Sequence, residues 1–311
     1  MRRVPPPAGD ITTSSAADRG RLANPGAAAS LTGRDLCAAA AVVVIWGLNF
    51  VAMKLGLRDF TPLQLGAGRF FFAFAPLALW VRPPRIGWKW VVTYSMLQGV
   101  AQFTFLFFAL KIGMTAALAP VLMQTAVFFT AIFASLLLHE SVGRPLKVGM
   151  TLAAAGLACF AVNVVTEGAA SGVTPAGLAL NLLAAAMWAA SNVVARKLQA
   201  VRSEYDPLAL VVWSGVVSSL SFALMSFVLD GGSARWRWTG ATLAGWSSLA
   251  YLGLVATALA NGLWTALLKR HPANRVAPFS LGMPVVGFVA GMLILDEHVT
   301  TLQCVGAVLV M

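Results

Sequence analysis

The sequence predicts an all-α membrane protein with ten transmembrane helices, arranged as two inverted repeats of five helices each. Three observations lead to this prediction. Hydrophobic residues make up 59% of the chain and charged residues only 11%. Apolar runs near the roughly 20 residues that a helix needs to cross a bilayer recur throughout, and an open sheet edge could not satisfy its backbone there. The third observation is an internal repeat that relates the two halves of the chain.

The apolar runs place the predicted helices in order along the chain. Nine are expected at residues 36–57, 63–81, 88–110, 113–138, 146–165, 175–195, 207–229, 241–268 and 274–295. A tenth begins at Leu302, and the stretch from there to Met311 would rise about 15 Å, half of the ~30 Å hydrocarbon layer. We therefore expect the last helix to be incomplete.

The basic net charge of +11 is distributed as membrane orientation requires, rather than as a surface for nucleic acid. With the N-terminus in the cytoplasm, most Lys and Arg residues lie in cytoplasmic loops. The cations that then face outward are Lys54, Arg58, Lys111, Arg235 and Arg237. The charge excess thus predicts topology and argues against a nucleic-acid partner.

An internal repeat divides most of the chain. Residues 114–154 align with 271–311 without a gap, and this alignment pairs Glu140 with Glu297. Near the start of each half, IWGLNFVAMK is similar to MWAASNVVARK. The predicted domains are a disordered cytoplasmic tail rich in Ala, Pro, Gly and Ser (1–33), a first repeat (34–168) and a second repeat (169–311). Because five is an odd number, the second repeat enters the membrane inverted, as in secondary transporters whose substrate site lies near the midplane.

Polar residues that interrupt the apolar helices are the candidates for a substrate site. Trp46 and Asn49 are spaced i and i+3, so they share a helix face, and an unpaired amide near the membrane midplane is costly. Trp188, Ser191 and Asn192 recur at the matching place in the second half. We expect these side chains to line a central cavity. The alternative is hydrogen bonding between helices, which membrane bundles use routinely.

Further side chains are predicted to face the same cavity. They form three pairs with helical spacing: Gln98 with Gln102, Pro120 with Gln124, and Asn261 with Trp264. Because Asn and Gln both donate and accept hydrogen bonds, these amides and the aromatic rings suit a zwitterion or a polar metabolite. Arg69 is an intramembrane charge near the outer end of its helix. Two roles stay open for it, a snorkelling anchor and a counterion for a substrate carboxylate.

Four residues are candidates for gating or coupling. Glu140 and Glu297 are related by the repeat, and each lies between the fourth and fifth helices of its half. Either could serve proton-linked gating, or simply accept hydrogen bonds at a helix end. Pro120 and Pro284 lie within predicted helices, where the missing backbone donor can produce a hinge or a static kink.

The sequence predicts neither a cofactor nor a metal site, and it argues against an enzyme. The three histidines are scattered, and the acidic residues lie in the tail or at helix ends, so no reactive cluster occurs within the helices. The chain also lacks the GxxxxGK[ST] phosphate loop that ATP hydrolysis would need. Any coupling would therefore use a gradient.

Three stretches occur in a characteristic order: WGLNFVAMKLGL followed by RFF, then AQFTFLFFALKIGMTAALAPVLMQTAVFFT, and finally RVAPFSLGMPVVGFVAGMLILDE. Together they resemble the EamA family of the drug/metabolite transporter superfamily, and most closely its O-acetylserine/cysteine exporter branch. The similarity runs from about Asp35 to Met311. It implies ten helices in two EamA repeats, cytoplasmic termini, a bacterial inner membrane and efflux of small metabolites such as amino acids. The positions that match family motifs are Trp46, Gly47, Asn49, Arg69, Gln102, Gln124, Glu140, Pro278, Pro284 and Glu297.

The predicted function is therefore export of amino acids or related small metabolites, such as cysteine or O-acetylserine, by alternating access. The predicted partners are a small-molecule substrate and the lipid bilayer, and a homodimer is left open. One alternative is a multidrug or nucleotide-precursor permease on the same scaffold, and a less favoured one is a membrane-embedded enzyme. Cavity chemistry separates the transporter classes: aromatic and Met side chains favour apolar cations, whereas Asn, Gln and Arg favour zwitterions.

Overall fold

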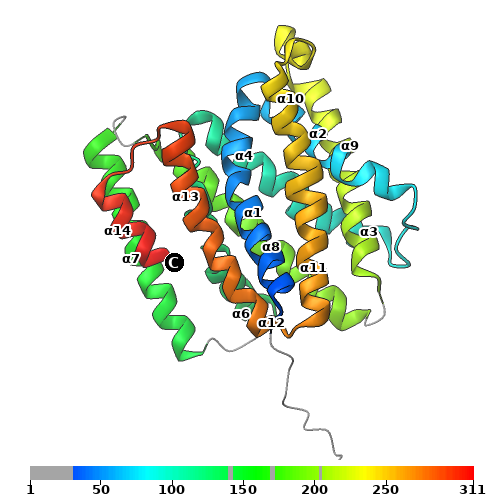
Figure 1. Cartoon of the computed structure of the whole chain (residues 1–311), viewed down its shortest axis with the longest axis horizontal. Helices are drawn as coiled ribbons and strands as arrows, with labels where there is room; N and C mark the ends of the chain where they lie inside the picture. Colours follow the sequence, from blue (N-terminus) through cyan, green and yellow to red (C-terminus); the bar gives the residue numbers. More distant parts are fainter. Residues whose placement is uncertain (1–30, 139–142, 169–171, 203–204) are drawn as a thin grey trace, which may run out of the picture.

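A computed structural model describes residues 31–138, 143–168, 172–202 and 205–311 of the chain. These residues form one bundle of helices, and no β-strand occurs among them (Figure 1). Eight helices of this part are long and apolar enough to cross a membrane, judged by length and composition. Two predicted spans are shorter, since α2 has 17 residues and α14 has 10. The all-helical membrane class is confirmed, the count of ten spans stays a prediction, and most of the predicted tail lies outside the described residues.

The helices follow one another along the chain with short connections. The first half holds α1 (Gly33–Asp59), α2 (Pro62–Ala78), α3 (Trp88–Tyr94), η2 (Ser95–Ala101), α4 (Gln102–Ile112), α5 (Ala119–Met123), α6 (Ala126–Leu138) and α7 (Arg144–Glu167). The second half holds α8 (Pro175–Val201), α9 (Pro207–Leu229), η4 (Gly232–Gly240), α10 (Leu243–Ala250), η5 (Tyr251–Leu259), α11 (Ala260–Arg270), α12 (Ala273–Val276), η6 (Ala277–Leu281), α13 (Gly282–Leu295) and α14 (Thr301–Val310).

Threonine caps explain where several helices start. The Thr32 hydroxyl accepts a hydrogen bond from the Asp35 backbone N–H at 3.3 Å, and the Asp35 carboxylate accepts from the Thr32 N–H in return. This capping box satisfies backbone donors that an α-helix leaves without partners at its N-terminus. Thr61 begins α2 and Thr300 begins α14 with the same arrangement. The signal is readable in the sequence, and it starts α1 a few residues before the predicted apolar run.

The predicted fourth span, 113–138, starts too early. Gly113 has a φ of 127°, outside the helical region, and a non-helical connection follows it before α5 begins. In this connection the backbone N–H groups of Ala116 and Ala117 donate to the carboxylate of Glu297, which comes from the other half of the chain. A contact between distant segments leaves no mark in the local apolar pattern, so the pattern favoured a continuous helix.

Three further predicted spans are not regular α-helices throughout. A π-helical segment, η2, joins α3 to α4, and a second one, η5, joins α10 to α11. The ninth predicted span begins in the short helix α12 and continues through the 3-10 turn η6 into α13. π-Helical segments are rare and are often found at functional sites. Both η2 and η5 contribute side chains to the central cavity.

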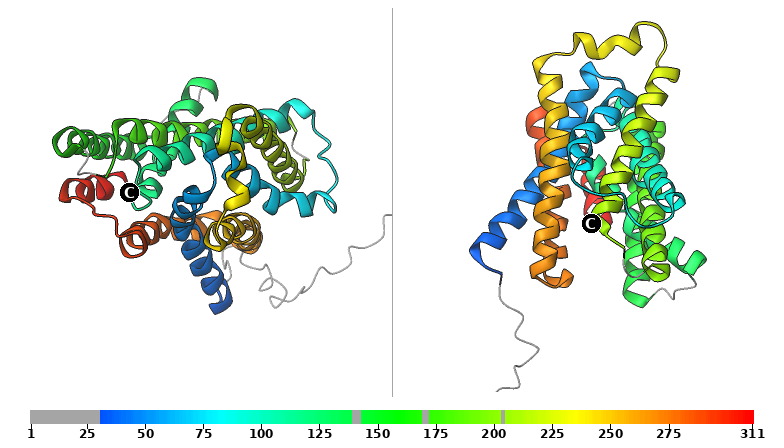
Figure 2. Two further views of the ribbon diagram at one scale, coloured as in Figure 1. Left: turned by 90° about the horizontal axis from the view of Figure 1, so that it is seen from above. Right: turned by 90° about the vertical axis from the view of Figure 1, so that its right-hand side faces the viewer.

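The two longest helices, α1 and α8, cross the middle of the bundle in the view of Figure 1, and part of α1 reaches the edge of the bundle in the views of Figure 2. Each has 27 residues, and its central residue is a tryptophan, Trp46 in α1 and Trp188 in α8. α1 packs against α13, α10 and α11, whereas α8 packs against α4 and α6. α2 pairs with α9 on one flank and α7 pairs with α14 on the other (Figure 1). The main apolar core, which includes Met53, Phe107 and Leu122, joins α1, α4 and α5.

Candidate functional site

A cavity of about 550 Å³ lies between the two halves of the chain. The first half contributes residues from α1, α2, η2, α4, α5 and α6, and the second half contributes residues from α8, η5, α11, η6 and α13. The volume falls within the range of about 300–1,000 Å³ that is typical of small-molecule sites.

Most of the predicted substrate-binding side chains meet at this cavity. Nine of them line it: Trp46, Asn49, Arg69, Gln98, Gln102, Gln124, Trp188, Asn261 and Trp264. Two others, both on α8, do not. Ser191 lies behind the wall, where its hydroxyl donates to the side-chain oxygen of Gln98, and Asn192 is not among the lining residues. The structure thus brings these residues together, and their contact with a substrate stays a prediction.

Trp46 and Trp264 form an aromatic wall between α1 and α11, with ring centroids 5.5 Å apart. The Trp46 Nε1–H donates to the carbonyl oxygen of Ala256 in η5 at 2.9 Å. A second cross-link joins the same two elements, because the Tyr251 hydroxyl donates to the carbonyl oxygen of Ile45 at 2.7 Å. These two bonds hold the Trp46 ring in a defined orientation at the cavity wall.

Arg69 is a buried cation, only 5% exposed. Its Nη1 donates to Asn49 Oδ1 at 3.1 Å, and its guanidinium carbon lies 4.4 Å from the centroid of the Phe103 ring. Its Nε makes no hydrogen bond to a described residue. Among the described residues that line the cavity there is no Asp or Glu. The positive charge therefore lies inside the bundle and is met by an amide dipole and an aromatic face.

The cavity amides differ in how far the protein satisfies them. Gln98 accepts from Ser191 on α8, and the Asn261 Nδ2 donates to the carbonyl oxygen of Thr257 at 2.6 Å. Gln102, the first residue of α4, is 5% exposed, and its Oε1 makes no hydrogen bond within the described part of the chain. A buried polar atom without a partner is unfavourable, and Gln102 Oε1 and Arg69 Nε are two such atoms on residues that line the cavity.

A smaller chamber of about 160 Å³ adjoins the central cavity on the far side of Arg69. The two spaces share Arg69, Gln98, Phe103 and Asn261. The chamber is otherwise formed by α2, α3, η2, α9 and η5. In it α9 comes close to η2 at Gly99 and to α2 at Gly215. Arg69 therefore lies between two spaces within the bundle and lines both of them.

Sequence reasoning missed the apolar part of the cavity. The additional lining residues are Phe50, Met53, Phe103, Leu106, Met123, Val127, Ala256, Ser280, Leu281 and Met283. Apolar side chains do not interrupt an apolar helix, so nothing in the local pattern distinguishes those that face a cavity from those that face lipid. Helical spacing gives a partial signal, since Met53 follows Asn49 at i+4. The cavity thus combines a polar, cationic part with aromatic and thioether surfaces.

The cavity is sealed at the end of the bundle where α1 finishes. Val51, Ala116 and Ala290 are buried together there, from α1, the α4–α5 connection and α13. α13 approaches this connection so closely that a Cβ placed on Gly291 would lie 2.6 Å from the Ala117 nitrogen. Only a glycine permits that approach, so the seal depends on backbone packing as well as on side chains.

Two charged side chains reinforce the sealed end. The Glu297 carboxylate accepts hydrogen bonds from two backbone N–H groups of the α4–α5 connection, each at 2.8 Å. Lys54 Nζ donates to the carbonyl oxygens of Leu110 at 2.9 Å and Met114 at 2.7 Å. Glu297 and Lys54 also line a separate space of about 310 Å³ beyond the seal. Each charge therefore binds backbone that lies across the bundle from its own helix.

The other three gating candidates are Glu140, Pro120 and Pro284. Glu140 lies outside the described residues. Pro120 is in the first turn of α5 and Pro284 is in the first turn of α13, and both line the cavity. Backbone N–H groups of a first turn have no partner within an α-helix, so proline breaks no intrahelical bond there. A hinge at either position stays a prediction. Nowhere in the described ranges are three His, Cys, Asp or Glu side chains grouped as a metal site requires.

Comparison with known proteins gives a consistent result. The model of the EamA-like transporter family matches residues 34–162 and again residues 175–311. A probable amino-acid metabolite efflux pump of Escherichia coli (strain K12) is 38% identical over 282 residues, covering 89% of this chain and 92% of that protein. A protein of the same description from Salmonella typhimurium is 37% identical and covers 87% and 90%, respectively. A crystal structure at 18% identity has a similar fold, with a TM-score of 0.56 over 89% of this chain and 94% of its own.

Proposed function

Because this chain belongs to the EamA-like transporter family, we propose that it exports amino acids or related small metabolites by alternating access around the central cavity. The family and the relatives establish a multi-pass membrane transporter and not an enzyme. The Escherichia coli and Salmonella relatives are described as probable amino-acid metabolite efflux pumps. The proposal extends that substrate class to this protein, with cysteine and O-acetylserine as the first candidates.

The proposed architecture has ten spans, with α14 as the last, in two inverted repeats at 34–168 and 169–311. The protein is placed in a bacterial inner membrane with its N-terminus in the cytoplasm. The central tryptophans of α1 and α8 support a relationship between the halves, because each occupies the same position in a helix of the same length. In this orientation the sealed end faces outward, and the structure corresponds to a state closed to the outside.

The observation that carries the proposed substrate class is Arg69. A buried guanidinium without an acidic partner is a receptor for a carboxylate, because Arg can form paired, charge-assisted hydrogen bonds with both carboxylate oxygens. Gln102 lines the same cavity, and its Oε1 is an acceptor without a partner in the described chain, which would suit the ammonium group of an amino acid. Together they supply one partner for each charge of a zwitterion.

Aromatic and Met side chains alone would favour an apolar cation, but beside Arg69 and the amides they fit an amino acid whose side chain is apolar or weakly polar. Met53, Met123 and Met283 line the cavity together with Trp188 and Phe50. Met side chains adapt to ligands of different shape, and aromatic rings provide a rigid apolar surface. The pocket therefore fits several related amino acids better than it fits one with a strongly charged side chain.

The alternative permeases fit the cavity less well. A cationic drug would bring a second positive charge next to Arg69, and no acidic side chain among the described lining residues would compensate for it. A nucleotide precursor carries several negative charges, whereas Arg69 is the one Lys or Arg among the described residues of the central cavity. Both comparisons favour a monocarboxylic zwitterion.

The first experiment is transport by the purified protein in liposomes. Vesicles loaded with unlabelled compound are given radiolabelled cysteine, O-acetylserine, methionine or leucine, and counterflow uptake is measured. Parallel samples contain the amine that lacks the carboxylate and the acid that lacks the amine. We expect counterflow for amino acids and none for the amines. Transport of a cationic dye or a nucleotide precursor, with no amino acid moved, would contradict the proposal.

The second experiment changes Arg69. In Arg69→Gln we expect transport at low substrate concentration to fall at least tenfold, because a hydrogen bond to a charged group contributes about 1.5–3 kcal/mol. Arg69→Lys keeps the charge but not the paired geometry, so it should recover only part of the rate. Arg85→Gln removes an exposed loop cation and is the matched control. Equal transport by Arg69→Gln and the control would refute the carboxylate-binding role.

A further inference from the structure

A second large cavity lies at the periphery of the bundle, where α2 and α9 pack together. Its volume is about 470 Å³, and it shares no lining residue with the central cavity. The walls are residues of α2, α9 and α10. Phe71 and Phe227 line it and are 56% and 64% exposed. The cavity therefore opens sideways, onto a helix surface that faces hydrocarbon in a membrane protein, and not toward the transport route.

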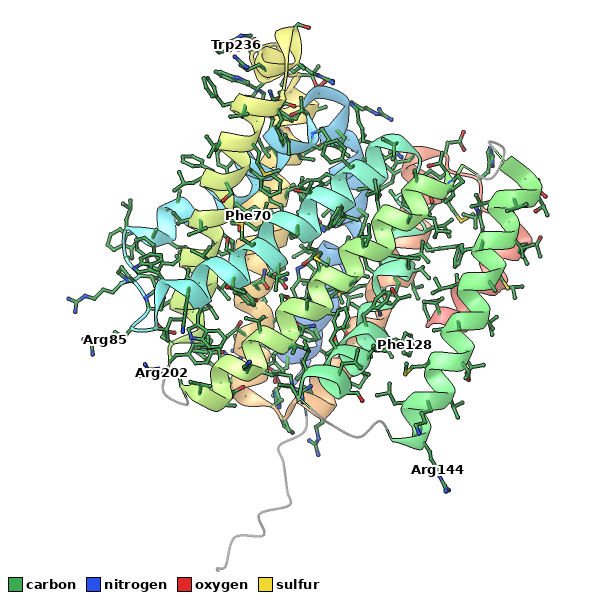
Figure 3. The ribbon with its side chains drawn as sticks, turned by 180° about the vertical axis from the view of Figure 1, so that it is seen from behind. Phe70, Arg85, Phe128, Arg144, Arg202 and Trp236 are labelled. Carbon is green, nitrogen blue, oxygen red and sulfur yellow. The ribbon has the colours of Figure 1, made fainter. Side chains whose placement is uncertain are left out.

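The 3-10 segment η4 forms the roof of this peripheral cavity. Trp236 and Trp238 from η4 and Trp246 from α10 line it, and Trp236 lies at the very end of the bundle (Figure 3). Tryptophan is enriched where a bilayer meets water, because its ring is apolar and its N–H is polar. Along α9 the wall runs from Ser219 to Phe227, which is about 12 Å at 1.5 Å per residue. The cavity thus extends from the interface into the hydrocarbon layer.

Side-chain hydrogen bonds from α2 hold the roof in place. Gln64 Nε2 donates to the carbonyl oxygens of Ala234 and Arg235, at 3.0 Å each. The Thr61 hydroxyl donates to the Asp230 carboxylate at 2.7 Å, at the point where α9 leads into η4. The roof is therefore fixed to the wall before any ligand binds, which makes the peripheral cavity a preformed site.

Arg235 is the cation of this site. Its guanidinium carbon lies 4.9 Å from the centroid of the Phe227 ring, and its Nε donates to the Asp230 carbonyl oxygen at 3.3 Å. Its terminal nitrogens make no hydrogen bond to a residue that the structure describes. Arg237, two residues further along the chain, differs from Arg235 in two ways. A terminal nitrogen of Arg237 donates to the Arg58 carbonyl oxygen at 2.5 Å, and Arg237 does not line the cavity.

We propose that the peripheral cavity binds a phospholipid with an anionic headgroup. One acyl chain would lie between α2, α9 and α10, and the phosphate would bind the terminal nitrogens of Arg235 beneath the tryptophans of η4. A laterally open apolar cavity in the hydrocarbon layer is filled by lipid chains, and a cation at its interfacial mouth selects an anionic headgroup. The inference rests on the membrane location of the chain and not on the proposed substrate.

Brominated lipids test the site directly, because bromine quenches tryptophan fluorescence only at close range. The purified protein is reconstituted in phosphatidylcholine with increasing mole fractions of either brominated phosphatidylglycerol or brominated phosphatidylcholine. We expect brominated phosphatidylglycerol to reach half-maximal quenching at about one fifth of the mole fraction that brominated phosphatidylcholine needs, the gain expected for one interfacial cation. Substituting phenylalanine for Trp236, Trp238 and Trp246 should remove this high-affinity component and identify where it arises.

Variants of the two neighbouring arginines separate a site from general surface charge. Arg235→Gln should abolish the preference for phosphatidylglycerol, Arg235→Lys should retain most of it, and Arg237→Gln should leave it unchanged. Equal loss in Arg235→Gln and Arg237→Gln, or no preference in the native protein, would overturn the proposal. Displacement of the quencher by a transported amino acid, or protection by self-association of the chain, would assign the cavity to another occupant and overturn it as well. Transport measured on the same vesicles keeps this outcome distinct from the substrate proposal.

Discussion

At the scale of single residues, Arg69 and Gln102 carry the buried polar atoms of the cavity lining that lack hydrogen-bond partners in the described chain. A charge or an amide oxygen that is removed from water without a full set of partners raises the free energy of the empty protein. The Phe103 ring and Asn49 relieve part of this for Arg69. A ligand that supplies the missing partners therefore gains binding free energy from groups that the protein alone leaves unsatisfied.

Replacing Gln102 should reduce transport without lowering the stability of the protein. In Gln102→Met the unsatisfied Oε1 is replaced by a side chain of similar length, so the melting temperature should not fall. Transport at low substrate concentration should fall about fivefold or more, because a substrate donor loses its acceptor. Gln303→Met is the control, since Gln303 is equally buried but caps α14 through the Thr300 N–H and should lose stability when changed. Thermal unfolding and counterflow are measured on both variants, and a matching fall in melting temperature would assign Gln102 a structural role.

The polar side chains of the cavity could be predicted from sequence because each one contradicts its apolar surroundings. Trp46 and Asn49, and Trp188 in the second half, stood out by helical spacing and recurrence. Ser191 had the same sequence signal, yet it supports the wall through Gln98 and does not line the cavity. Helical spacing fixes the face of a helix to within about a quarter turn, which is too coarse to separate a lining residue from the one that supports it.

At the scale of helices, α13 acts as a closely fitted seal. Gly47 and Gly287 allow α1, α13 and α5 to approach within backbone distance: a Cβ on Gly47 would lie 2.5 Å from Val286, and one on Gly287 would lie 2.7 Å from Pro120. Such small-residue contacts are typical of helix packing in membranes. Because the two glycines add no side chain of their own to these contacts, α13 lies close against α1 and α5.

A movement of α13 away from the first half of the chain would have to break the two hydrogen bonds that the Glu297 carboxylate accepts. We predict that Glu297→Gln favours opening of the sealed end, because a neutral amide offers one acceptor oxygen to the two N–H groups that the carboxylate now binds. In a variant without the three native cysteines, Ala290→Cys should react with a membrane-impermeant maleimide at least fivefold faster when Glu297→Gln is added. Glu167→Gln, an exposed carboxylate at a helix end, serves as the control. Identical labelling rates in the two variants would show that Glu297 is only a cap for the α4–α5 connection.

Most helix boundaries were predictable, and the exceptions share a physical cause. Apolar length and the Thr and Pro signals at helix starts depend on local sequence, so spans such as α9 are predicted to the residue. The exceptions are the non-helical connection that follows Gly113 and the π-helical segments η2 and η5. They contact distant segments of the chain; for example, the Trp46 Nε1–H donates to the Ala256 carbonyl oxygen of η5. Local periodicity carries no information about such partners.

At the scale of the whole molecule, the charges are sorted between the two ends of the bundle. Arg85 and Arg202 lie in connections and Arg144 begins α7, and all three lie toward the same end (Figure 3). Trp236 and the segment η4 lie at the opposite end. Loops rich in Lys and Arg stay in the cytoplasm during insertion, so this sorting favours a cytoplasmic location for the end that carries the three arginines.

This orientation can be tested by labelling single cysteines in intact cells, because an impermeant maleimide reaches only the outer face. In a variant without native cysteines, Trp238→Cys in η4 should be labelled in intact cells, since the positive-inside asymmetry predicts that η4 lies outside. Arg85→Cys and Arg202→Cys should be labelled only after the membrane is permeabilised. The reversed pattern would place the sealed end in the cytoplasm, and the structure would then be a state closed to the cytoplasm. Labelling of all three positions in intact cells would indicate a mixed orientation, for which the charge asymmetry between the two ends gives no physical reason.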